Sequence, residues 1–154
     1  MEPTADQFLA IVDALYRFGA GQDLKDRDLF LSSFADDAVL DFVQPAARLG
    51  VEIEPFRGLP AIAEAVLGST SSLDTTHTIT NPRVTRFDGD SATLYALVEA
   101  QHLPSADHGQ HLLLKNHYDV ELTRRSDRWV IANMVIRNVW MTGTPAVLFP
   151  APAD

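Results

Sequence analysis

Four long β-rich segments fill the second half of the chain, and they are separated by short turns. The segments cover residues 75–87, 91–103, 110–124 and 129–142. Asp88-Gly89-Asp90 and Ser126-Asp127 are typical of tight hairpin turns, and residues 104–109 of a longer one. Because strands joined by such short connections pair in opposite directions, the pattern predicts an antiparallel meander.

The first twenty residues have the periodicity of an amphipathic helix instead. Thr4 and Gln7 stand at the spacing of a capping box. Apolar residues follow at helical spacing on one face, namely Phe8, Ile11, Val12, Leu15 and Phe18. We expect the helix to end at Gly19-Ala20-Gly21, because glycine readily adopts the left-handed conformation of a helix C-terminus.

The segments between this helix and the meander are shorter. We expect a helix over about 26–33, a strand over 38–42, a brief edge strand over 51–54, and a helix that opens at Gly58-Leu59-Pro60. Helices followed by a bent antiparallel sheet predict an α+β fold: a cone-shaped curved sheet wrapped around the N-terminal helices, with a pocket between them. We expect a single domain over 1–154, whose tail, 144–154, either folds back over the pocket or frays.

Composition excludes several classes of function. The 154 residues include 12 Lys+Arg and 21 Asp+Glu, a formal net charge of −9, which disfavours nucleic acid and anionic membranes as main partners. The absence of cysteine rules out disulfides, thiolate metal sites and a cysteine nucleophile. With no apolar run long enough to span a bilayer and no signal-peptide pattern, we expect a cytoplasmic protein.

Three polar residues interrupt otherwise apolar strand faces. His77 shares a face with Ile79, His102 ends an apolar face, and Asn116 is the lone polar residue on another. Each costs roughly 1–3 kcal/mol to bury without a partner, so their convergence on one cavity is typical of a binding pocket. Each of them could equally be a hydrogen-bonded structural residue of the core.

Asp23 has two interpretations that the residues alone leave open. It either caps the second helix, in competition with Asp26, or faces His77 at the mouth of the cone. In the second case the carboxylate would fix the tautomer of the imidazole, hold the ring and raise its basicity. The free ring nitrogen would then serve as a general base.

Motifs for metal or cofactor binding are missing. The sequence has no H-x-x-x-H, H-E-x-x-H, G-x-G-x-x-G, phosphate-binding loop or G-x-S-x-G motif. We therefore expect neither a metal nor a cofactor.

Several short motifs in this order carry a resemblance to a known family. They are Gln22-Asp23, 34–41, Phe56-Arg57-Gly58, 76–81, 88–92, Tyr118-Asp119 and 129–131. With them the chain resembles, over residues 6–143, the SnoaL-like branch of the nuclear transport factor 2-like superfamily. That branch contains scytalone dehydratase, a hexachlorocyclohexane dehydrochlorinase and a bile-acid dehydratase. The resemblance implies a cystatin-like α+β barrel around a deep apolar pocket.

The resemblance also implies roles for individual residues. In the lyase members an Asp–His dyad is the base, and Asp23 and His77, 54 residues apart, fall on its positions. His102 falls at the position of a second histidine that lines the pocket in scytalone dehydratase. Asn116 falls at the position of a polar group that orients the substrate. Further substrate-binding residues are expected at Tyr16, Phe42, Tyr118 and Trp140. Scytalone dehydratase positions a water with two tyrosines, whereas Gln22 and Phe42 occupy the matching places here.

We therefore predict a cofactor-independent lyase, of the dehydratase or dehydrohalogenase type, for a small, apolar, cyclic substrate. An isomerase or polyketide cyclase with the same base, and a non-catalytic ligand-binding module, are the alternatives. The resemblance further implies a homo-oligomer, either a dimer or a trimer.

Overall fold

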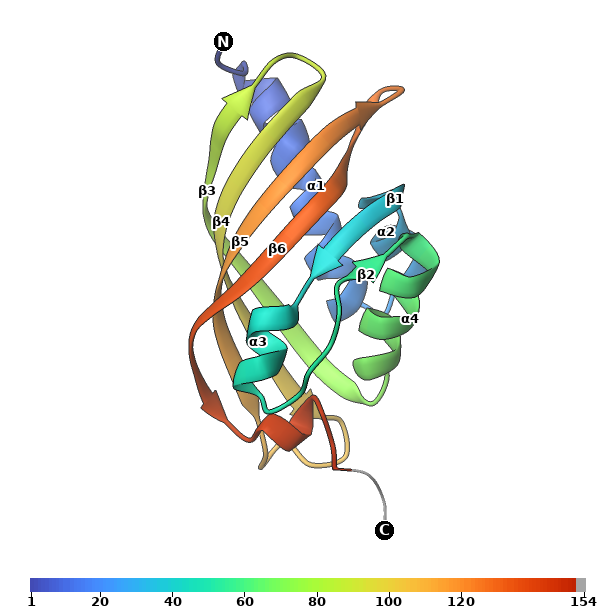
Figure 1. Ribbon diagram of the computed structural model, residues 1–154, viewed down its shortest axis with the longest axis vertical. Helices are drawn as coiled ribbons and strands as arrows, with labels where there is room; N and C mark the ends of the chain where they lie inside the picture. Colours follow the sequence, from blue (N-terminus) through green and yellow to red (C-terminus); the bar gives the residue numbers. More distant parts are fainter. Residues whose placement is uncertain (152–154) are drawn as a thin grey trace.

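The computed structural model describes residues 1–151, and a strongly curved sheet wraps around helices that lie against its concave face (Figure 1). The helices are α1 (Ala5–Asp23), α2 (Arg27–Leu31), α3 (Val43–Arg48), α4 (Leu59–Ser69) and a 3₁₀ turn, η1 (Pro145–Val147). The strands are β1 (Phe34–Asp41), β2 (Phe56–Arg57), β3 (Leu73–Phe87), β4 (Ser91–Pro104), β5 (Leu112–Arg125) and β6 (Arg128–Gly143). The end of the predicted tail, residues 152–154, lies outside the described residues.

The sheet has the strand order β2-β1-β6-β5-β4-β3. The predicted meander is confirmed, because β3, β4, β5 and β6 pair antiparallel in sequence. The sheet is not purely antiparallel, however, since β1 runs parallel to β6. After β1 the chain passes through α3, returns as the short edge strand β2 beside β1, and crosses through α4 to the opposite edge, where β3 begins the meander. The last strand of the meander, β6, therefore lies beside β1.

Three local expectations are corrected by the structure. Helix α1 does not stop at the glycines but continues to Asp23, and β1 begins at Phe34 rather than at 38. Residues 51–54 form no strand, and the preceding segment 43–48 is helical. By contrast, the capping box of Thr4 and Gln7 and the helix that opens after Gly58 are present as predicted.

The glycines inside α1 allow close packing instead of ending the helix. A Cβ added to Gly21 would lie 2.5 Å from the backbone nitrogen of Phe30 in α2. A Cβ on Gly19 would lie 3.1 Å from the Cβ of His77 in β3. The last two turns of α1 therefore touch both α2 and the edge of the sheet, which places the end of α1 beside β3.

Arg17 ties α1 to the sheet from within. Its side chain is almost fully buried, and its Nε donates to Asp13 Oδ2 at 2.7 Å. Its terminal nitrogens donate to the backbone carbonyls of Ser32 and of Trp129 in β6. One guanidinium thus satisfies carbonyl groups from two separate elements, and buried groups need such partners to avoid a desolvation cost.

The inner face of the sheet carries the core. Buried side chains alternate along β4 and β5 as predicted, at Ala92 to His102 and at Leu112 to Leu122. A second, smaller apolar cluster gathers Leu49, Leu73, Leu112 and Leu114 with Val147 and Leu148 of the C-terminal segment. Leu114 and Leu148 of this smaller cluster also line the cavity between the sheet and the helices.

Within residues 1–151, none of the helices combines the length and the apolar character required to cross a membrane. The single domain, the cytoplasmic location and the homo-oligomer stay predictions.

The packing of Gly21 predicts an unequal effect of two alanine substitutions. Gly21→Ala should lower the free energy of unfolding by about 1–3 kcal/mol, because its methyl group would overlap the backbone of α2. Gly68→Ala in α4 is the matched control, since no atom lies within 4 Å of its added Cβ. It should be neutral or stabilising by up to about 1 kcal/mol. Urea unfolding measures both, and equal effects would contradict the packing argument.

Candidate active site

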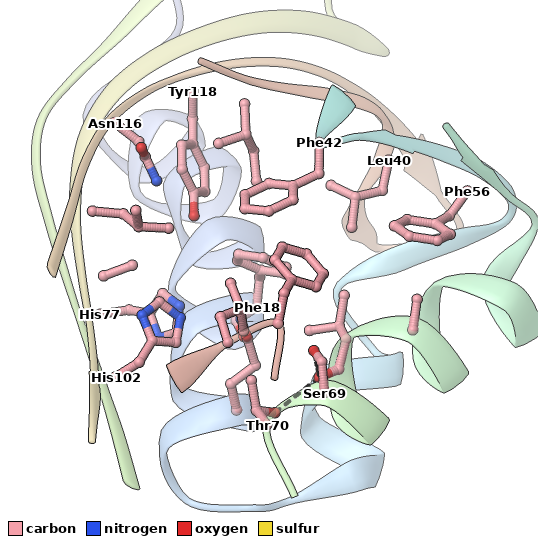
Figure 2. A pocket seen from close by; sticks show the side chains of 18 of the residues that line it. Phe18, Leu40, Phe42, Phe56, Ser69, Thr70, His77, His102, Asn116 and Tyr118 are labelled. Atoms are coloured by element: carbon pink, nitrogen blue, oxygen red, sulfur yellow. Dashed lines mark hydrogen bonds between the residues drawn. The ribbon is translucent and has the colours of Figure 1, made fainter. Parts of the chain in front are cut away.

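A deep apolar cavity lies between the concave face of the sheet and helices α1 and α4 (Figure 2). It encloses about 650 Å³ of space between atoms, including the part that opens to solvent. Aromatic rings and aliphatic chains form most of its wall, among them Phe18, Leu40, Phe42, Phe56, Leu114 and Phe149. Polar groups enter it from the strands: His77 from β3, His102 from β4, and Asn116 and Tyr118 from β5.

Asp23 and His77 form a hydrogen-bonded pair at the wall of this cavity. The Nδ1 atom of His77 lies 2.6 Å from Oδ1 of Asp23. The backbone N–H of His77 donates to Oδ2 at 2.8 Å, and the hydroxyl of Thr75 donates to Oδ1 at 2.9 Å. The His77 side chain is only 3% exposed and that of Asp23 21%. The pair is therefore held on both carboxylate oxygens and largely withdrawn from water.

The position of β3 in the sheet explains why a carboxylate binds there. β3 is the last strand in the sheet order, so one of its edges has no neighbouring strand to accept its N–H groups. Asp23, at the C-terminal end of α1, accepts one of these groups, that of His77. Asp26 caps α2 through a bond from the backbone N–H of Leu29 at 3.0 Å. Asp23 is thus free for His77, which resolves the alternative that the sequence left open.

The charge of Asp23 fixes the tautomer of His77. Burial raises the pKa of the Asp23 carboxyl, but the hydrogen bonds and charge interaction with His77, with the Thr75 bond, outweigh burial and lower it overall. An ionised carboxylate can only accept, so Nδ1 of His77 carries the proton of this bond. In the neutral ring, Nε2 then keeps its lone pair, which is the arrangement of a general base.

His102 is a buried neutral histidine beside the dyad. Its ring lies 6.2 Å from that of His77, centroid to centroid, and nearly perpendicular to it. Burial, with a smaller contribution from the charge of His77, lowers the pKa of His102 to about 4. Its Nδ1 lies 3.1 Å from the carbonyl oxygen of Leu112, an acceptor, so Nδ1 donates and Nε2 remains an acceptor.

Asn116 and Tyr118 are neighbours on the inner face of β5, and both are buried. Burial raises the pKa of the Tyr118 hydroxyl, and a hydrogen bond with Asn116 opposes the shift without cancelling it. The hydroxyl therefore stays protonated across the ordinary pH range. In Figure 2 the Tyr118 oxygen points into the cavity toward the side of the two histidines.

Six of the eight predicted site residues lie together in the structure. Five of them line the cavity, and Asp23 is bonded to one of these five; the five are His77, His102, Asn116, Tyr118 and Phe42. The expectation for Tyr16 and Trp140 is wrong: they are 45% and 48% exposed and do not line it. Tyr16 lies on the solvent side of α1. Trp140 follows a β-bulge in β6. On one side of the bulge Asn138 pairs with Asn116 of β5, and on the other side Trp140 pairs with Lys115 of β5. The bulge turns Trp140 to the outer face, where Lys115 Nζ lies 5.5 Å from its ring.

Other residues line the cavity that were not among the predicted site residues. Gln22 lines the cavity from α1, with its Nε2 donating to the Phe18 carbonyl at 3.2 Å. Its place beside Asp23 in the last turn of α1 was a usable signal. Leu148 and Phe149 line the cavity from the C-terminal segment, and the Phe149 ring lies 6.5 Å from that of Phe42. The sequence left open whether the tail over 144–154 folds back over the pocket or frays.

Metal binding finds no support in the described part of the chain. Among residues 1–151, no group of three or more His, Asp and Glu side chains is arranged to hold a metal ion.

The buried neutral state of His102 predicts a pH dependence of stability. Its pKa is near 4 in the folded chain and near 6.5 when unfolded, so the unfolded chain binds more protons between these values. Stability should therefore fall as the pH drops from about 6.5 to about 4, by an amount on the order of 3 kcal/mol. Urea unfolding over this range measures it. His102→Asn keeps a donor for the Leu112 carbonyl and should flatten this part of the profile; an unchanged profile would contradict the assignment.

Solved structures share this fold. The chain matches a candidate aromatic ring hydroxylase from Novosphingobium aromaticivorans with a TM-score of 0.83 at 22% identity, over 96% of this chain and 99% of that one. It also matches the hexachlorocyclohexane dehydrochlorinase LinA-type3 from Novosphingobium barchaimii, with a TM-score of 0.71 at 21% identity, over 93% of each chain. At these identities the similarity shows the fold.

Sequence comparison shows the family. Terrestric acid biosynthesis cluster protein E from Penicillium crustosum is 31% identical over 147 residues, which cover 90% of this chain and 86% of that protein. The family profile of the SnoaL-like domain matches residues 3–135, a range that includes Asp23, His77, Asn116 and Tyr118. By this match and by its fold, the chain belongs to the SnoaL-like domain family.

Proposed function

We propose that the protein is a cofactor-independent lyase in which His77, held by Asp23, removes a proton from carbon. The observation that carries the proposal is the 2.6 Å contact between Nδ1 of a 3% exposed imidazole and a carboxylate, at the wall of an apolar cavity. The similarity of the fold to a dehydrochlorinase supports elimination. The relation to a biosynthesis cluster protein supports a small-molecule substrate.

The proposed reaction moves one proton and two electron pairs. Nε2 of His77 takes a proton from a substrate carbon, and the electrons of that C–H bond form a double bond to the neighbouring carbon. The bond from this second carbon to the leaving group breaks, and the leaving group keeps its electrons. A departing hydroxide takes the proton back from His77 and leaves as water, whereas a halide leaves as an anion and His77 releases its proton to solvent.

Asp23 supports the step electrostatically. When His77 accepts the proton it becomes an imidazolium, and the adjacent carboxylate stabilises this charge in a site with little water. The three bonds to Asp23 also fix the ring, so that Nε2 faces the cavity without reorganisation. General-base catalysis of this kind contributes roughly 10²–10⁴-fold in rate.

His102 takes part as an acceptor rather than as an acid. Because its Nδ1–H is used by the Leu112 carbonyl and the ring is neutral, Nε2 can only accept a hydrogen bond. We infer that it orients a substrate hydroxyl. Donors toward a leaving group or a carbonyl must then come from β5, where Asn116 and Tyr118 face the cavity.

Substitutions in the dyad should reduce turnover without loss of the fold. His77→Ala and Asp23→Asn should each lower kcat/KM by roughly 10²–10⁴-fold, because one removes the base and the other its orienting charge. The assay is a panel of cyclic β-hydroxyketones and cyclic chlorinated hydrocarbons, with products identified by mass spectrometry. Loss of water or hydrogen chloride identifies a lyase, whereas a product of unchanged mass favours the isomerase or cyclase alternative.

The chain contains a matched control for these variants. Asp74 and His108 form another carboxylate–imidazole pair, at 2.7 Å, but on the exposed surface away from the cavity. His108→Ala and Asp74→Asn should leave kcat/KM within about twofold, since the pair does not touch the site. Full activity of the dyad variants, or an equal loss in the control variants, would remove the proposed mechanism.

We further propose that the chain forms a single domain in which residues 144–151 cover the pocket. Leu148 and Phe149 line the cavity and contact its wall at Phe42. Phe149→Ala should raise KM by roughly 5–30-fold through lost apolar contact, with a smaller change in kcat. Val139→Ala, an equally apolar change on the exposed outer face, serves as the control. Steady-state kinetics on the active panel compound measure both, and an unchanged KM for Phe149→Ala would contradict the covering role.

A further inference from the structure

Asn138 lies behind the cavity wall in β6 and is not itself a lining residue. It is 4% exposed. Its Nδ2 donates to three oxygens: the backbone carbonyls of Trp140 at 2.9 Å and Lys115 at 3.4 Å, and the side-chain Oδ1 of Asn116 at 2.9 Å. Carbonyl oxygens of the backbone can only accept, so the nitrogen of the Asn138 amide, and not its oxygen, must face this group.

The backbone of Asn138 is held as well. Its N–H donates to Oε1 of Gln44 at 2.7 Å, and its carbonyl accepts from Nη1 of Arg48 at 2.9 Å. Both partners belong to α3, which therefore fixes Asn138 from the side opposite to β5. These bonds fix the backbone of Asn138, and the carbonyls of Trp140 and Lys115, residues that do not line the cavity, set the orientation of its amide.

This orientation determines the orientation of the Asn116 amide. Because Asn138 offers a donor, Asn116 must turn its oxygen toward β6 and its nitrogen away from it. Asn116 lines the cavity, and in Figure 2 its nitrogen lies on the side of the Tyr118 hydroxyl. The result is an amide N–H₂ and a phenolic O–H side by side on β5, on the same sheet wall that carries His77 on β3 and His102 on β4.

We propose that Asn138 is a positioning residue that makes Asn116 a donor beside Tyr118, and that the pocket therefore takes a substrate with an acceptor oxygen at this place. The chemical class is a cyclic ketone or a related carbonyl compound. With the opposite amide orientation, Asn116 would present an oxygen there and would repel a carbonyl. A purely halogenated hydrocarbon would offer no acceptor to the phenolic O–H or to the amide N–H that Asn116 does not use toward Tyr118, which costs binding energy.

The two donors, the Asn116 amide and the Tyr118 hydroxyl, suit the chemistry of the proposed function. The proposed substrate class rests on that function. When His77 takes a proton from the carbon next to a carbonyl, the electrons of the C–H bond form a carbon–carbon double bond. The electrons of the carbonyl π bond move to oxygen, which becomes an enolate oxyanion. When the oxyanion re-forms the carbonyl, the electrons of the carbon–carbon double bond shift to the next carbon, and the leaving group departs from that carbon with its bonding electrons. Two fixed donors aimed at that oxygen stabilise it more than they stabilise the neutral carbonyl.

The test uses 4-nitrophenol, whose phenolate absorbs visible light and mimics an enolate oxygen, with toluene as a ring of similar shape that lacks an acceptor. Asn138→Ala frees the Asn116 amide to rotate, and Asn116→Asp keeps an acceptor for Asn138 but turns an oxygen to the cavity. Each variant should bind the phenolate roughly tenfold or more weakly, because a charge-assisted hydrogen bond is lost, and toluene within about twofold of the unsubstituted protein.

The outcomes separate positioning from damage to the fold. An equal loss of both ligands, or an unchanged affinity for the phenolate in both variants, would overturn the proposal. The Asn138→Ala comparison is then repeated in the His77→Ala background, which lacks the base. Persistence of the phenolate effect there supports the donor pair even if the lyase assay fails. Disappearance of the effect would place the probe oxygen at His77 and overturn the proposal while leaving the base intact.

Discussion

One carboxylate connects the two layers of this protein at the point where its chemistry is proposed. Asp23, the last residue of α1, accepts three hydrogen bonds from the free edge of β3, from Thr75 and from the backbone and ring of His77. The contact exists only because α1 approaches α2 and β3 closely, at Gly21 and Gly19. A shift of α1 would therefore disturb three things together. These are the packing of the helix, the hydrogen bonds of the free edge of β3, and the position of the imidazole of His77.

The fold divides into a part that local sequence determines and a part that it does not. The meander was predictable because apolar alternation and turn residues are properties of neighbouring positions, such as Asp88-Gly89-Asp90. The parallel pairing of β1 with β6 joins segments about ninety residues apart, as in Leu40 with Met134, and no local pattern records it. Likewise, two glycines near the end of α1 are typical of a helix C-terminus. The helix nevertheless continues to Asp23, and only the packing of α2 against Gly21 explains why.

The candidate site divides in the same way. His77, His102 and Asn116 were found because each interrupts an apolar strand face, whereas the pairing of Asp23 with His77 depended on a family resemblance and on tertiary structure. The prediction for Trp140 was wrong because it assumed that inward-facing and outward-facing side chains alternate strictly along β6. The bulge in β6 interrupts this alternation. Asn138 was not found at all: its role comes from which atoms it faces in β5 and α3, and that information exists only in three dimensions.

The same pair of residue types occurs twice in this chain with opposite consequences. Asp23–His77 and Asp74–His108 have nearly the same separation, 2.6 Å and 2.7 Å, and both pairs lower the pKa of their carboxyl. The His108 and Asp74 side chains are 57% and 48% exposed, so water screens their charges and competes for their hydrogen bonds. Around His77 the apolar wall excludes that competition, and the imidazole lines the cavity. Distance alone therefore does not distinguish His77 from His108 as the proposed base; the surrounding cavity does.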